Sequence, residues 1–432
     1  MPAQAESRIG LIAGGGAIPI EIARSIEARG GSVHVIAIAG DADPALFAFP
    51  HTVVAWSELG RAIAALKAAD VSDVLLVGTM ARPKLSTARF DLALFSILPS
   101  VLKVLRQAGD DALLRTCIEL FERRGFRAVG VRDVAPELLI AAGPIGSRAP
   151  TVADEADIAL GLRVIAALGR FDIGQAAIVS EGVVEALEGA EGTDAMLTRT
   201  AAARARLDVP SDRRRGVLVK RPKPGQDLRV DLPAIGPGTA TAAAMAGLTG
   251  IAAMHGYVLT AKRDEMIDKA DAAGVFIAGV EAPLAYGASG DGAVAPQEFS
   301  EIGAVTLSTA TRNDAALGVR VLRALADLNT GSALIVRKSR VVAVGASEPA
   351  ADVLRRDAAY RKPGRNSRKG AAVIGSGANV DADLIAAAAA AGVAALIITP
   401  EHKAAIVRRS QLLATANSLR LALAVASREA TR

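Results

Sequence analysis

The chain is poor in aromatic residues and nearly free of cysteine. Aromatic residues make up 3% of its 432 residues, and Cys117 is the single cysteine. One cysteine excludes an internal disulfide framework, and the N-terminus MPAQAESRIG has no apolar signal-peptide region, so we expect a cytoplasmic protein. Few aromatic rings and a net charge of only +5 argue against a nucleic-acid partner.

Long apolar runs and clustered histidines are also missing. The longest apolar run, at 384–400, is rich in alanine and split by Gly392, which makes it a poor match to a membrane span. We predict a buried helix and strand there. The four histidines show no metal-ligand spacing, so zinc is not expected. Cys117 falls within a helical pattern, where a core thiol is a better interpretation than a nucleophile.

What the chain does have is length and a 51% apolar content, which together predict a globular protein of two to three domains. Strand and helix patterns alternate from residue 8 onward, beginning with RIGLIA, the turn GGGAIP and a helix, then SVHVIAIAG. Repeated βαβ units predict a parallel sheet. The predicted fold class is therefore α/β, with a Rossmann-like parallel-sheet domain at residues 7–143 followed by further α/β domains.

The second half of the chain contains an internal repeat. With an offset of 157, residues 157–179 lie over residues 314–336 without a gap and share the LG, RV, AL, G and IV positions. An ungapped match of this length favours duplication. We predict a second α/β domain at 151–281, a linker at 282–305, and a degenerate copy of the second domain at 306–427, which has lost the polar segment described next.

The most informative segment is RGVLVKRPKPGQDLRVDLPAIG at 215–236, with five cations, two carboxylates and three prolines. In LRVDL the apolar residues alternate with Asp227, Arg229 and Asp231, so an extended chain would place these three on one face. The two carboxylates would then be about 13 Å apart, too far to share one Mg²⁺. An exposed strand face with Arg229 between two acids is the plain alternative. Lys220 and Lys223, held by prolines, favour an anionic ligand.

Other polar or glycine-rich segments follow predicted strands or begin predicted helices, and each has a structural alternative. The turn Gly14, Gly15 and Gly16 would bind phosphate or ribose, or be a plain tight turn. Arg82 would bind an anion or be exposed to solvent. Asp110 and Asp111, and likewise Thr193 and Asp194, would bind ligand or metal or cap the helix that they begin. Gln175 would bind ligand or close a backbone hydrogen bond. The candidate substrate-binding residues are Gly14, Gly15, Gly16, Gly78, Thr79, Met80, Arg82, Asp110, Asp111, Gln175, Thr193, Asp194, Lys223 and Arg229.

Six of these segments occur in an order that resembles a known family. GLIAGGGAIP, GTMARP, GDDALLR, DIGQAAIV, EGTDAML and KRPKPGQDLRVDLPAIGP are similar to the motifs of LpxI-type UDP-2,3-diacylglucosamine diphosphatases, over about residues 7–281. The resemblance implies a two-domain enzyme that hydrolyses UDP-2,3-diacylglucosamine to UMP and 2,3-diacylglucosamine 1-phosphate in lipid A biosynthesis. It also implies Mg²⁺, for which Mn²⁺ could substitute. The essential aspartate of the family corresponds to Asp231.

This resemblance sets the predicted roles. Asp231, Asp227 and Lys220 are the predicted catalytic residues, with Asp231 as metal ligand or as the group that orients water. The acylated substrate implies peripheral contact with the inner-membrane surface. The family resemblance implies a homodimer, or a monomer if the duplicate replaces the partner. Two other classes stay open: a non-catalytic nucleotide-sugar or lipid-binding protein, and a nicotinamide-dependent oxidoreductase, for which the GxGxxG turn is missing.

Overall fold

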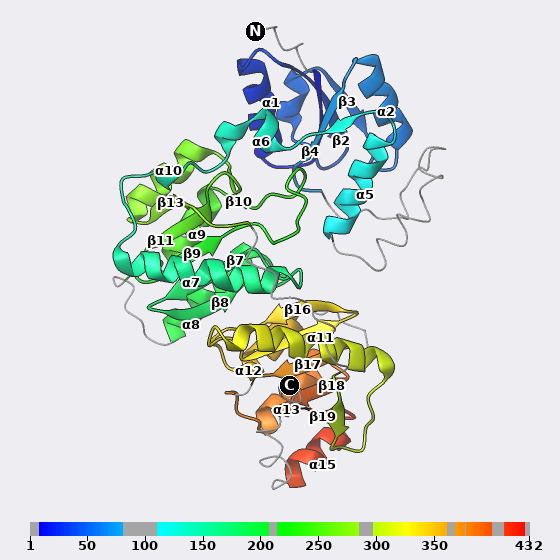
Figure 1. The fold of residues 1–432 in the computed structure, drawn as a ribbon, viewed down its shortest axis with the longest axis vertical. Helices are drawn as coiled ribbons and strands as arrows, with labels where there is room; N and C mark the ends of the chain where they lie inside the picture. The colour runs from blue at the N-terminus through cyan, green and yellow to red at the C-terminus, as the bar shows by residue number, and fades with distance from the viewer. Residues whose placement is uncertain are drawn as a thin grey trace.

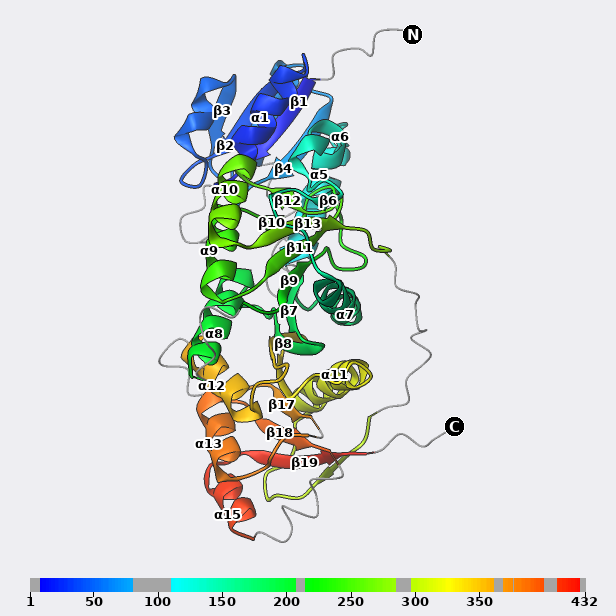
Figure 2. The same cartoon turned by 90° about the vertical axis from the view of Figure 1, so that its left-hand side faces the viewer.

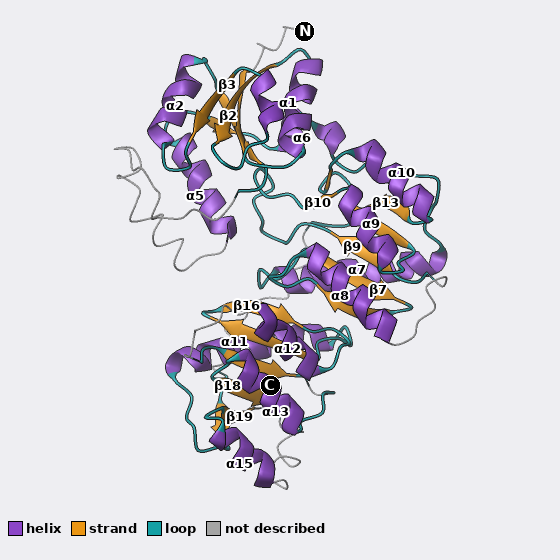
Figure 3. Cartoon of the chain, turned by 180° about the vertical axis from the view of Figure 1, so that it is seen from behind, coloured by secondary structure: helices purple, strands orange, loops and turns teal. Residues whose placement is uncertain are grey.

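The structure is a computed structural model that describes residues 8–80, 110–206, 214–284, 297–360, 368–375, 377–399 and 410–427. Three α/β units follow one another along the long axis of the molecule (Figure 1). In the second and third units helices cover both faces of the sheet, with α7 and α11 on one side and the remaining helices on the other (Figure 2). The strands of each unit therefore lie between layers of helices (Figure 3).

The N-terminal unit is built on a five-stranded parallel sheet of order β3-β2-β1-β4-β5. β1 and β2 are largely buried, which explains why their sequences are nearly continuous apolar runs instead of alternating ones. The parallel sheet predicted for this domain is confirmed. Its elements are β1 (Arg8–Ala13), α1 (Ile18–Ala28), β2 (Ser32–Ile38), η1 (Pro44–Ala48), β3 (His51–Val54), α2 (Leu59–Ala68), β4 (Asp73–Val77), α5 (Asp110–Glu122), β5 (Arg127–Ala128), α6 (Val131–Val134) and η3 (Pro136–Leu138).

The second unit has a mixed six-stranded sheet of order β6-β13-β11-β9-β7-β8, in which β9, β11 and β13 are parallel. A separate short pair joins β10 to β12. The elements are β6 (Gly143–Pro144), α7 (Val152–Gly169), β7 (Ala176–Ser180), β8 (Val183–Leu187), α8 (Thr193–Arg206), β9 (Val217–Lys220), β10 (Ala234–Ile235), α9 (Pro237–Met245), β11 (Gly250–Met254), β12 (Leu259–Thr260), α10 (Arg263–Ala273) and β13 (Phe276–Val280).

The third unit has a six-stranded sheet of order β14-β19-β18-β17-β15-β16. Its first strand lies within the stretch 282–305 that the sequence predicts as a linker, and it pairs with β19, so this sheet begins before residue 306. The elements are β14 (Phe299–Glu301), α11 (Thr309–Ala326), β15 (Ala333–Arg337), β16 (Arg340–Val344), α12 (Ala350–Tyr360), β17 (Ala371–Ile374), α13 (Ala382–Ala391), β18 (Ala395–Ile398), α15 (Ser410–Ser418) and β19 (Ala422–Ala426).

The second and third units share their strand order, strand directions and a bulge at matching positions. The pairing of β7 with β8 shifts register between Ile178 and Val179, and that of β15 with β16 shifts between Ile335 and Val336. Each of these pairs of residues differs by 157 in sequence number. The outermost partners, β6 and β14, are antiparallel to β13 and β19.

Matching side chains also make matching contacts in the two units. Asp157 accepts hydrogen bonds from the amides of Glu181 and Gly182, and Asp314 accepts them from Lys338 and Ser339. The helix that precedes the hairpin packs so closely on the sheet that only glycine fits. A Cβ on Gly161 would lie 2.6 Å from Val219, and one on Gly318 would lie 2.4 Å from Val373.

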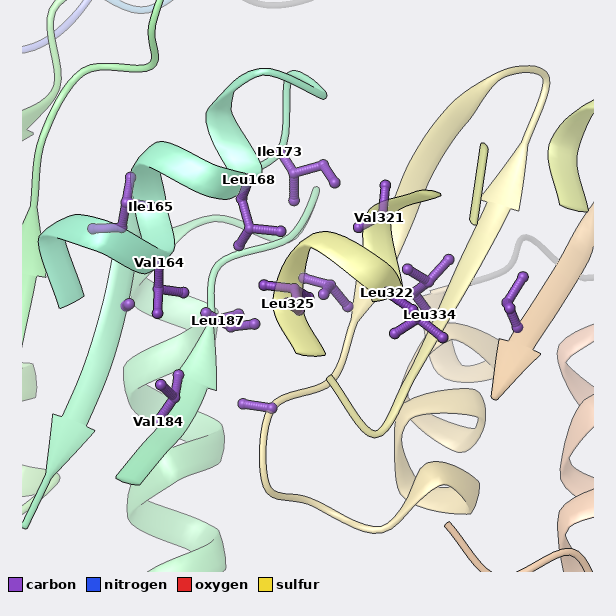
Figure 4. Close-up of a cluster of buried hydrophobic side chains, with 14 of the residues drawn as sticks. Val164, Ile165, Leu168, Ile173, Val184, Leu187, Val321, Leu322, Leu325 and Leu334 are labelled. Atoms are coloured by element: carbon purple, nitrogen blue, oxygen red, sulfur yellow. The ribbon is translucent and has the colours of Figure 1, made fainter. Parts of the chain in front are cut away.

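Helices α7 and α11 contact each other where the second and third units meet. One continuous buried apolar cluster runs from Leu168 and Leu187 in the second unit to Leu322, Leu325 and Leu334 in the third (Figure 4). The hydroxyl of Ser347 also donates to the carbonyl of Glu185 across the junction. The third unit is therefore packed against the second through a shared core.

The alanine-rich run at 384–400 contributes to α13 and to β18, whose residues are largely buried. The helix and strand predicted there are observed. Over the described ranges, no helix combines the length and apolar character that crossing a bilayer requires.

Candidate active site

The segment that carries Asp227 and Asp231 is a loop between β9 and β10, and it is not extended. The amides of Val230 and Asp231 both donate to the carbonyl of Asp227, at 3.2 and 3.1 Å. The prediction of an extended LRVDL face with widely separated acids is therefore wrong. Gly225 begins the bend with a φ of 78°, a conformation that favours glycine. Asp227 then stabilises the turn by accepting a hydrogen bond from the amide of Arg229.

Asp227 and Arg229 form a two-pronged ion pair within this turn. The guanidinium donates through Nε to Oδ1 at 3.0 Å and through Nη2 to Oδ2 at 2.8 Å. These hydrogen bonds from Arg229 hold the pKa of the Asp227 carboxyl below its ordinary value. The same contacts with Asp227, joined by Glu122, hold the pKa of Arg229 above its own. Asp227 thus orients Arg229. The alternative of a strand face with Arg229 between Asp227 and Asp231 is not what the structure shows, because the ion pairs of Arg229 within the described residues are with Asp227 and Glu122.

The loop is also bound to α5 of the N-terminal unit. Arg229 donates to Glu122 at 2.8 Å, and Arg115 donates to the carbonyl of Gly225 at 2.5 Å. The loop passes so near α6 that a Cβ on Gly130 would lie 3.1 Å from the Cα of Arg229. Residues more than a hundred positions apart in sequence therefore build one site between the first two units.

A cavity of about 600 Å³ opens where this loop meets the carboxyl ends of the N-terminal parallel strands. That edge of an open α/β sheet is where ligands usually bind. Most of its wall is aliphatic or aromatic, and its charged members are Glu58, Arg229 and Asp231. The apolar wall includes Ile12, Ile18, Ile36, Ile38, Val54, Trp56, Leu59, Leu76, Leu120, Phe121, Val230 and Leu232.

The glycine turn and the Gly78 loop line this cavity, but they are bonded to each other. The amide of Gly15 donates to the carbonyl of Thr79 at 2.7 Å, the amide of Thr79 donates back at 2.9 Å, and the amide of Gly14 donates to Val77. A Cβ on Gly14 would lie 2.3 Å from the Thr79 oxygen. The amides of Gly14 and Gly15 are therefore occupied, and the prediction that they bind phosphate as free donors is wrong. Gly16 and Met80 also line the cavity.

A second polar cluster surrounds Lys220 at the carboxyl end of β9. The ammonium of Lys220 donates to Thr193 at 2.8 Å, and Thr193 donates to Glu188 at 2.7 Å. Glu188 also accepts from the amide of Gln175. Burial lowers the pKa of Lys220, while the charges of Glu188 and Asp194 act in the opposite direction. Glu188 is buried, and the sequence did not single it out, because it stands among other small and acidic residues in the chain.

Gln226 connects the two parts of the site and was also missed. Its side-chain amide donates to the carbonyl of Asp231 at 2.8 Å, while its oxygen accepts from Gln175 at 3.2 Å and from the amide of Lys223 at 2.9 Å. Only 8% of Gln226 is exposed. A continuous chain of hydrogen bonds therefore leads from Lys220 to the backbone of Asp231. The motif KRPKPGQD offers no pattern that distinguishes this glutamine from a solvent-exposed one.

The predicted site residues thus fall into groups. Eight lie around the cavity, namely Gly14, Gly15, Gly16, Gly78, Thr79, Met80, Arg229 and Asp231. Gln175, Thr193, Asp194 and Lys220 belong to the second cluster. The ammonium of Lys223 pairs with Asp172 at 2.5 Å, which the sequence did not suggest. The backbone of Asp110 and Asp111 begins α5, but the structure does not describe their side chains. Arg82 lies outside the described residues.

Cys117 lines the cavity, yet burial raises the pKa of its thiol to about 11. The thiol therefore stays protonated near neutral pH and is a poor nucleophile. This agrees with the interpretation of Cys117 as a core residue.

The first two α/β units enclose an apolar cavity at the carboxyl edge of a parallel sheet, and a loop rich in charged residues forms part of its wall. This arrangement defines a two-domain ligand-binding or catalytic protein. Comparison with known proteins makes this class specific. The family model of the LpxI N-terminal domain matches residues 8–138, and that of the LpxI C-terminal domain matches residues 141–278. The chain belongs to the LpxI family.

A named relative supports this assignment. The UDP-2,3-diacylglucosamine pyrophosphatase LpxI of Caulobacter vibrioides is 42% identical over 274 residues, which cover 63% of this chain and 98% of that protein. The resemblance stated from the sequence motifs is confirmed. The third unit lies outside both family matches.

Proposed function

We propose that the chain hydrolyses UDP-2,3-diacylglucosamine to UMP and 2,3-diacylglucosamine 1-phosphate, a step of lipid A biosynthesis. The observation that carries the proposal is the 42% identity to a pyrophosphatase over 98% of its length. A purely binding role is not favoured by this relative, which is named as an enzyme. The site chemistry gives separate support, because a charged loop adjoins a large apolar cavity, as an acylated diphosphate requires.

In this proposal the acyl chains enter the apolar cavity of the N-terminal unit. Each methylene buried there contributes about 0.8 kcal/mol. This differs from the expectation that the glycine turn binds the phosphate or ribose of the nucleotide, because the aliphatic walls beside it offer few hydrogen-bond partners to a nucleotide. The nucleotide half would then lie toward the carboxyl edge of the second sheet, where Lys220, Thr193 and Gln175 gather.

Arg229 and Asp231 supply the charges at the reacting diphosphate. Arg229 is oriented by Asp227 and by Glu122, so its guanidinium is held in place to neutralise phosphate oxygens. Asp231 would orient the attacking water or accept its proton. Gln226 fixes the Asp231 backbone through its carbonyl. Lys220, in a buried cluster, would act on the nucleotide phosphate through its positive charge.

A divalent cation fits this site if the phosphate oxygens of the substrate supply part of its coordination shell. The described residues contain no group of three His, Cys, Asp or Glu side chains that could hold a metal. Mg²⁺ often binds through one or two carboxylates and completes its shell with phosphate oxygens and water. Asp231 would be the protein ligand, and the ion would supply charge neutralisation to the diphosphate.

The third unit, in our proposal, is a duplicate of the second that lacks its chemistry. Support comes from the shared strand order, the matching bulges and the equivalent contacts of Asp157 and Asp314. Because α11 packs on its own counterpart α7, the duplicate would take the place of a second copy of the chain, and the full-length chain would be a monomer.

We also propose that the chain contacts the inner-membrane surface, since its substrate is a lipid. The described N-terminal unit exposes three large apolar side chains, those of Phe47, Val53 and Met80, and Met80 also lines the apolar cavity. Sedimentation with vesicles of anionic phospholipid tests this. We expect binding that falls when Phe47 and Met80 are both changed to serine, and binding unaffected by this pair would contradict it.

The decisive assay for the activity is release of UMP from UDP-2,3-diacylglucosamine by the purified chain with Mg²⁺. UDP-N-acetylglucosamine serves as the matched control, because it keeps the diphosphate and carries a single acetyl group in place of the two long acyl chains. We expect hydrolysis of the acylated substrate and little of the control. Equal rates on the two would contradict a role for the apolar cavity, and absence of UMP with both would contradict the proposed activity.

A further inference from the structure

Glu188 is a buried carboxylate in the second polar cluster, and it takes no part in the hydrolysis proposed above. It follows β8 directly, and 8% of the residue is exposed. Its amide donates to the carbonyl of Ala176 at 3.0 Å, and its Oε2 accepts from the amide of Gln175 at 2.5 Å. Its backbone and its side chain are therefore both fixed at the start of β7. Burial of a carboxylate costs free energy, so a carboxylate held there needs a compensating partner.

Thr193 joins Glu188 to the cation of this cluster. The ammonium of Lys220 donates to the hydroxyl of Thr193 at 2.8 Å. An ammonium has no acceptor, so the hydroxyl accepts in this bond and gives its own proton to Glu188, at 2.7 Å. The carboxylate thus fixes the direction of the hydroxyl, and the hydroxyl fixes the ammonium. Burial lowers the pKa of Lys220, and the charge of Glu188 opposes this more strongly than the charge of Asp194 does.

The ammonium of Lys220 has hydrogen-bonding capacity left for a ligand. It carries three N–H groups, and in the described part of the chain one of them is used, by Thr193. Lys220 ends β9 and keeps a small accessible surface, 7% of the residue. Both oxygens of Glu188 are already occupied, one by Thr193 and one by Gln175. The cluster therefore offers a ligand the donors of a cation, which suit phosphate oxygens.

The third unit lacks the chain of hydrogen bonds from Glu188 through Thr193 to Lys220. A glycine and an alanine stand at the positions offset by 157 from Glu188 and Thr193. The pairing of β9 with β7, and of β17 with β15, places Ile374 where the second unit has Lys220. A unit with the same strand order therefore forms without this chain of hydrogen bonds.

A neighbouring ion pair, by contrast, is present in both units. Arg199 pairs with Glu191 at 3.4 Å, and Arg356 pairs with Glu348 at 2.9 Å, at positions that differ by 157. The pair that the two units share belongs to their common fold. The chain from Glu188 to Lys220 is confined to the unit that adjoins the proposed active site, which connects it with the chemistry of that unit.

We propose that Glu188 is a positioning residue of the active site, which through Thr193 holds Lys220 in place for a phosphate group in the nucleotide half of the substrate. Glu188 itself does not touch the substrate. The role rests on the proposed function, which supplies the nucleotide phosphate.

The test is binding of UMP and of uridine to the full-length chain by titration calorimetry, in EDTA so that no metal contributes. We expect the wild type to bind UMP at least about tenfold more tightly than uridine, because Lys220 bonds to the phosphate. Glu188→Gln keeps the size of the side chain and removes its charge. It should weaken UMP binding about tenfold and leave uridine binding unchanged. Unchanged UMP binding, equal losses for the two probes, or a wild type without preference for UMP would overturn the proposal.

Two changes at Thr193 test the same chain of hydrogen bonds without altering a charge. Thr193→Val removes the hydroxyl at nearly the same size and should weaken UMP binding as Glu188→Gln does. Thr193→Ser keeps the hydroxyl and should retain the wild-type affinity. Equal UMP affinities of these two variants would contradict the role of Thr193 and with it that of Glu188.

Glu185→Gln is the matched control. Glu185 lies on β8 and pairs with Arg204 at 2.7 Å and with Arg215 at 3.4 Å, and Arg215 precedes β9, at the opposite end of that strand from Lys220. We expect a lower urea midpoint from Glu185→Gln and wild-type binding of UMP. Loss of UMP affinity in this variant equal to that in Glu188→Gln would reduce the effect of Glu188 to general stability and overturn the proposal.

A double variant shows whether Glu188 acts through Lys220. In a Lys220→Met protein, Glu188→Gln should cause no further loss of UMP affinity, and additive losses would contradict the proposal. UMP release from the lipid substrate is measured on the same preparations. A wild type that releases no UMP, but whose UMP binding depends on Glu188, would remove the proposed activity and leave this role. A wild type that releases UMP, but binds it independently of Glu188, would do the reverse.

Discussion

Gln226 provides the sharpest test of the site, because its side chain donates a hydrogen bond to the backbone carbonyl of Asp231. Replacing it by alanine removes three hydrogen bonds, of 2.8 Å to Asp231, 2.9 Å to Lys223 and 3.2 Å to Gln175. Each is worth about 1 kcal/mol net, and the low exposure of Gln226 limits replacement by water, so we expect Gln226→Ala to lose about 2–3 kcal/mol of stability.

Only one of these three bonds holds Asp231 in place. If its loss raises the activation barrier by about 1.4 kcal/mol, kcat for UMP release falls about tenfold. KM should change less, because Gln226 does not line the cavity. The assay is steady-state UMP release beside a urea unfolding curve on the same preparation.

Gln297→Ala is the matched control for this experiment. Gln297 also donates through its side chain to backbone carbonyls, but it lies in the third unit, far in sequence from the site. We expect wild-type kcat from it. A Gln226→Ala protein that loses stability as calculated yet keeps full kcat would refute the argument that this glutamine positions Asp231.

Four further predictions concern the same chain. Asp231→Ala should reduce kcat at least about a hundredfold and Asp227→Ala less, because Asp227 acts by orienting Arg229; equal losses, measured by UMP release, would give both acids the same role. Chelation by EDTA should abolish UMP release and added Mg²⁺ or Mn²⁺ restore it, and full activity in EDTA would exclude the metal role. Arg229 lowers the pKa of Asp227, so the ion pair stabilises the folded protein above the ordinary aspartate pKa, and this stabilisation is lost as the pH falls through the lowered pKa. The urea midpoint of the wild type should therefore drop more steeply below about pH 4 than that of Asp227→Asn. Parallel curves for the two proteins would contradict this. A chain of residues 8–284, which spans both residue ranges matched by the LpxI domain models, should keep some hydrolysis and form dimers on size-exclusion chromatography. A stable, inactive monomer would show that the third unit completes the site.

The parallel sheet of the N-terminal unit could be predicted because its strands are buried on both faces, so β1 and β2 are apolar at nearly every position. The sequence match between the second and third units was visible for a related reason. Positions that pack the core, such as Gly161 and Gly318 against their sheets, retain the same residue at a fixed offset.

The site was harder to predict, because its form depends on contacts that sequence spacing does not encode. LRVDL alternates like a strand, but the positive φ of Gly225 and the side-chain hydrogen bond of Asp227 to the amide of Arg229 turn the chain. The pair Arg229 and Glu122 joins residues 107 positions apart. Glu188 and Gln226 are buried polar groups whose partners come from other elements, and a polar residue in a loop carries no signal of such burial.

The contacts of Arg229 have a consequence for how the two halves of the enzyme can move apart. One guanidinium holds Asp227 on its own loop and Glu122 on α5, and Arg115 holds the same loop at Gly225. Separation of the two units would therefore break the bond of Arg229 to Glu122 and the bond of Arg115 to the carbonyl of Gly225. The turn around Asp231 keeps its own hydrogen bonds in such a separation, whereas Arg229 keeps Asp227 alone as its partner. In the proposed reaction, the position of the Arg229 charge is therefore the feature of the site that depends on the two units being together.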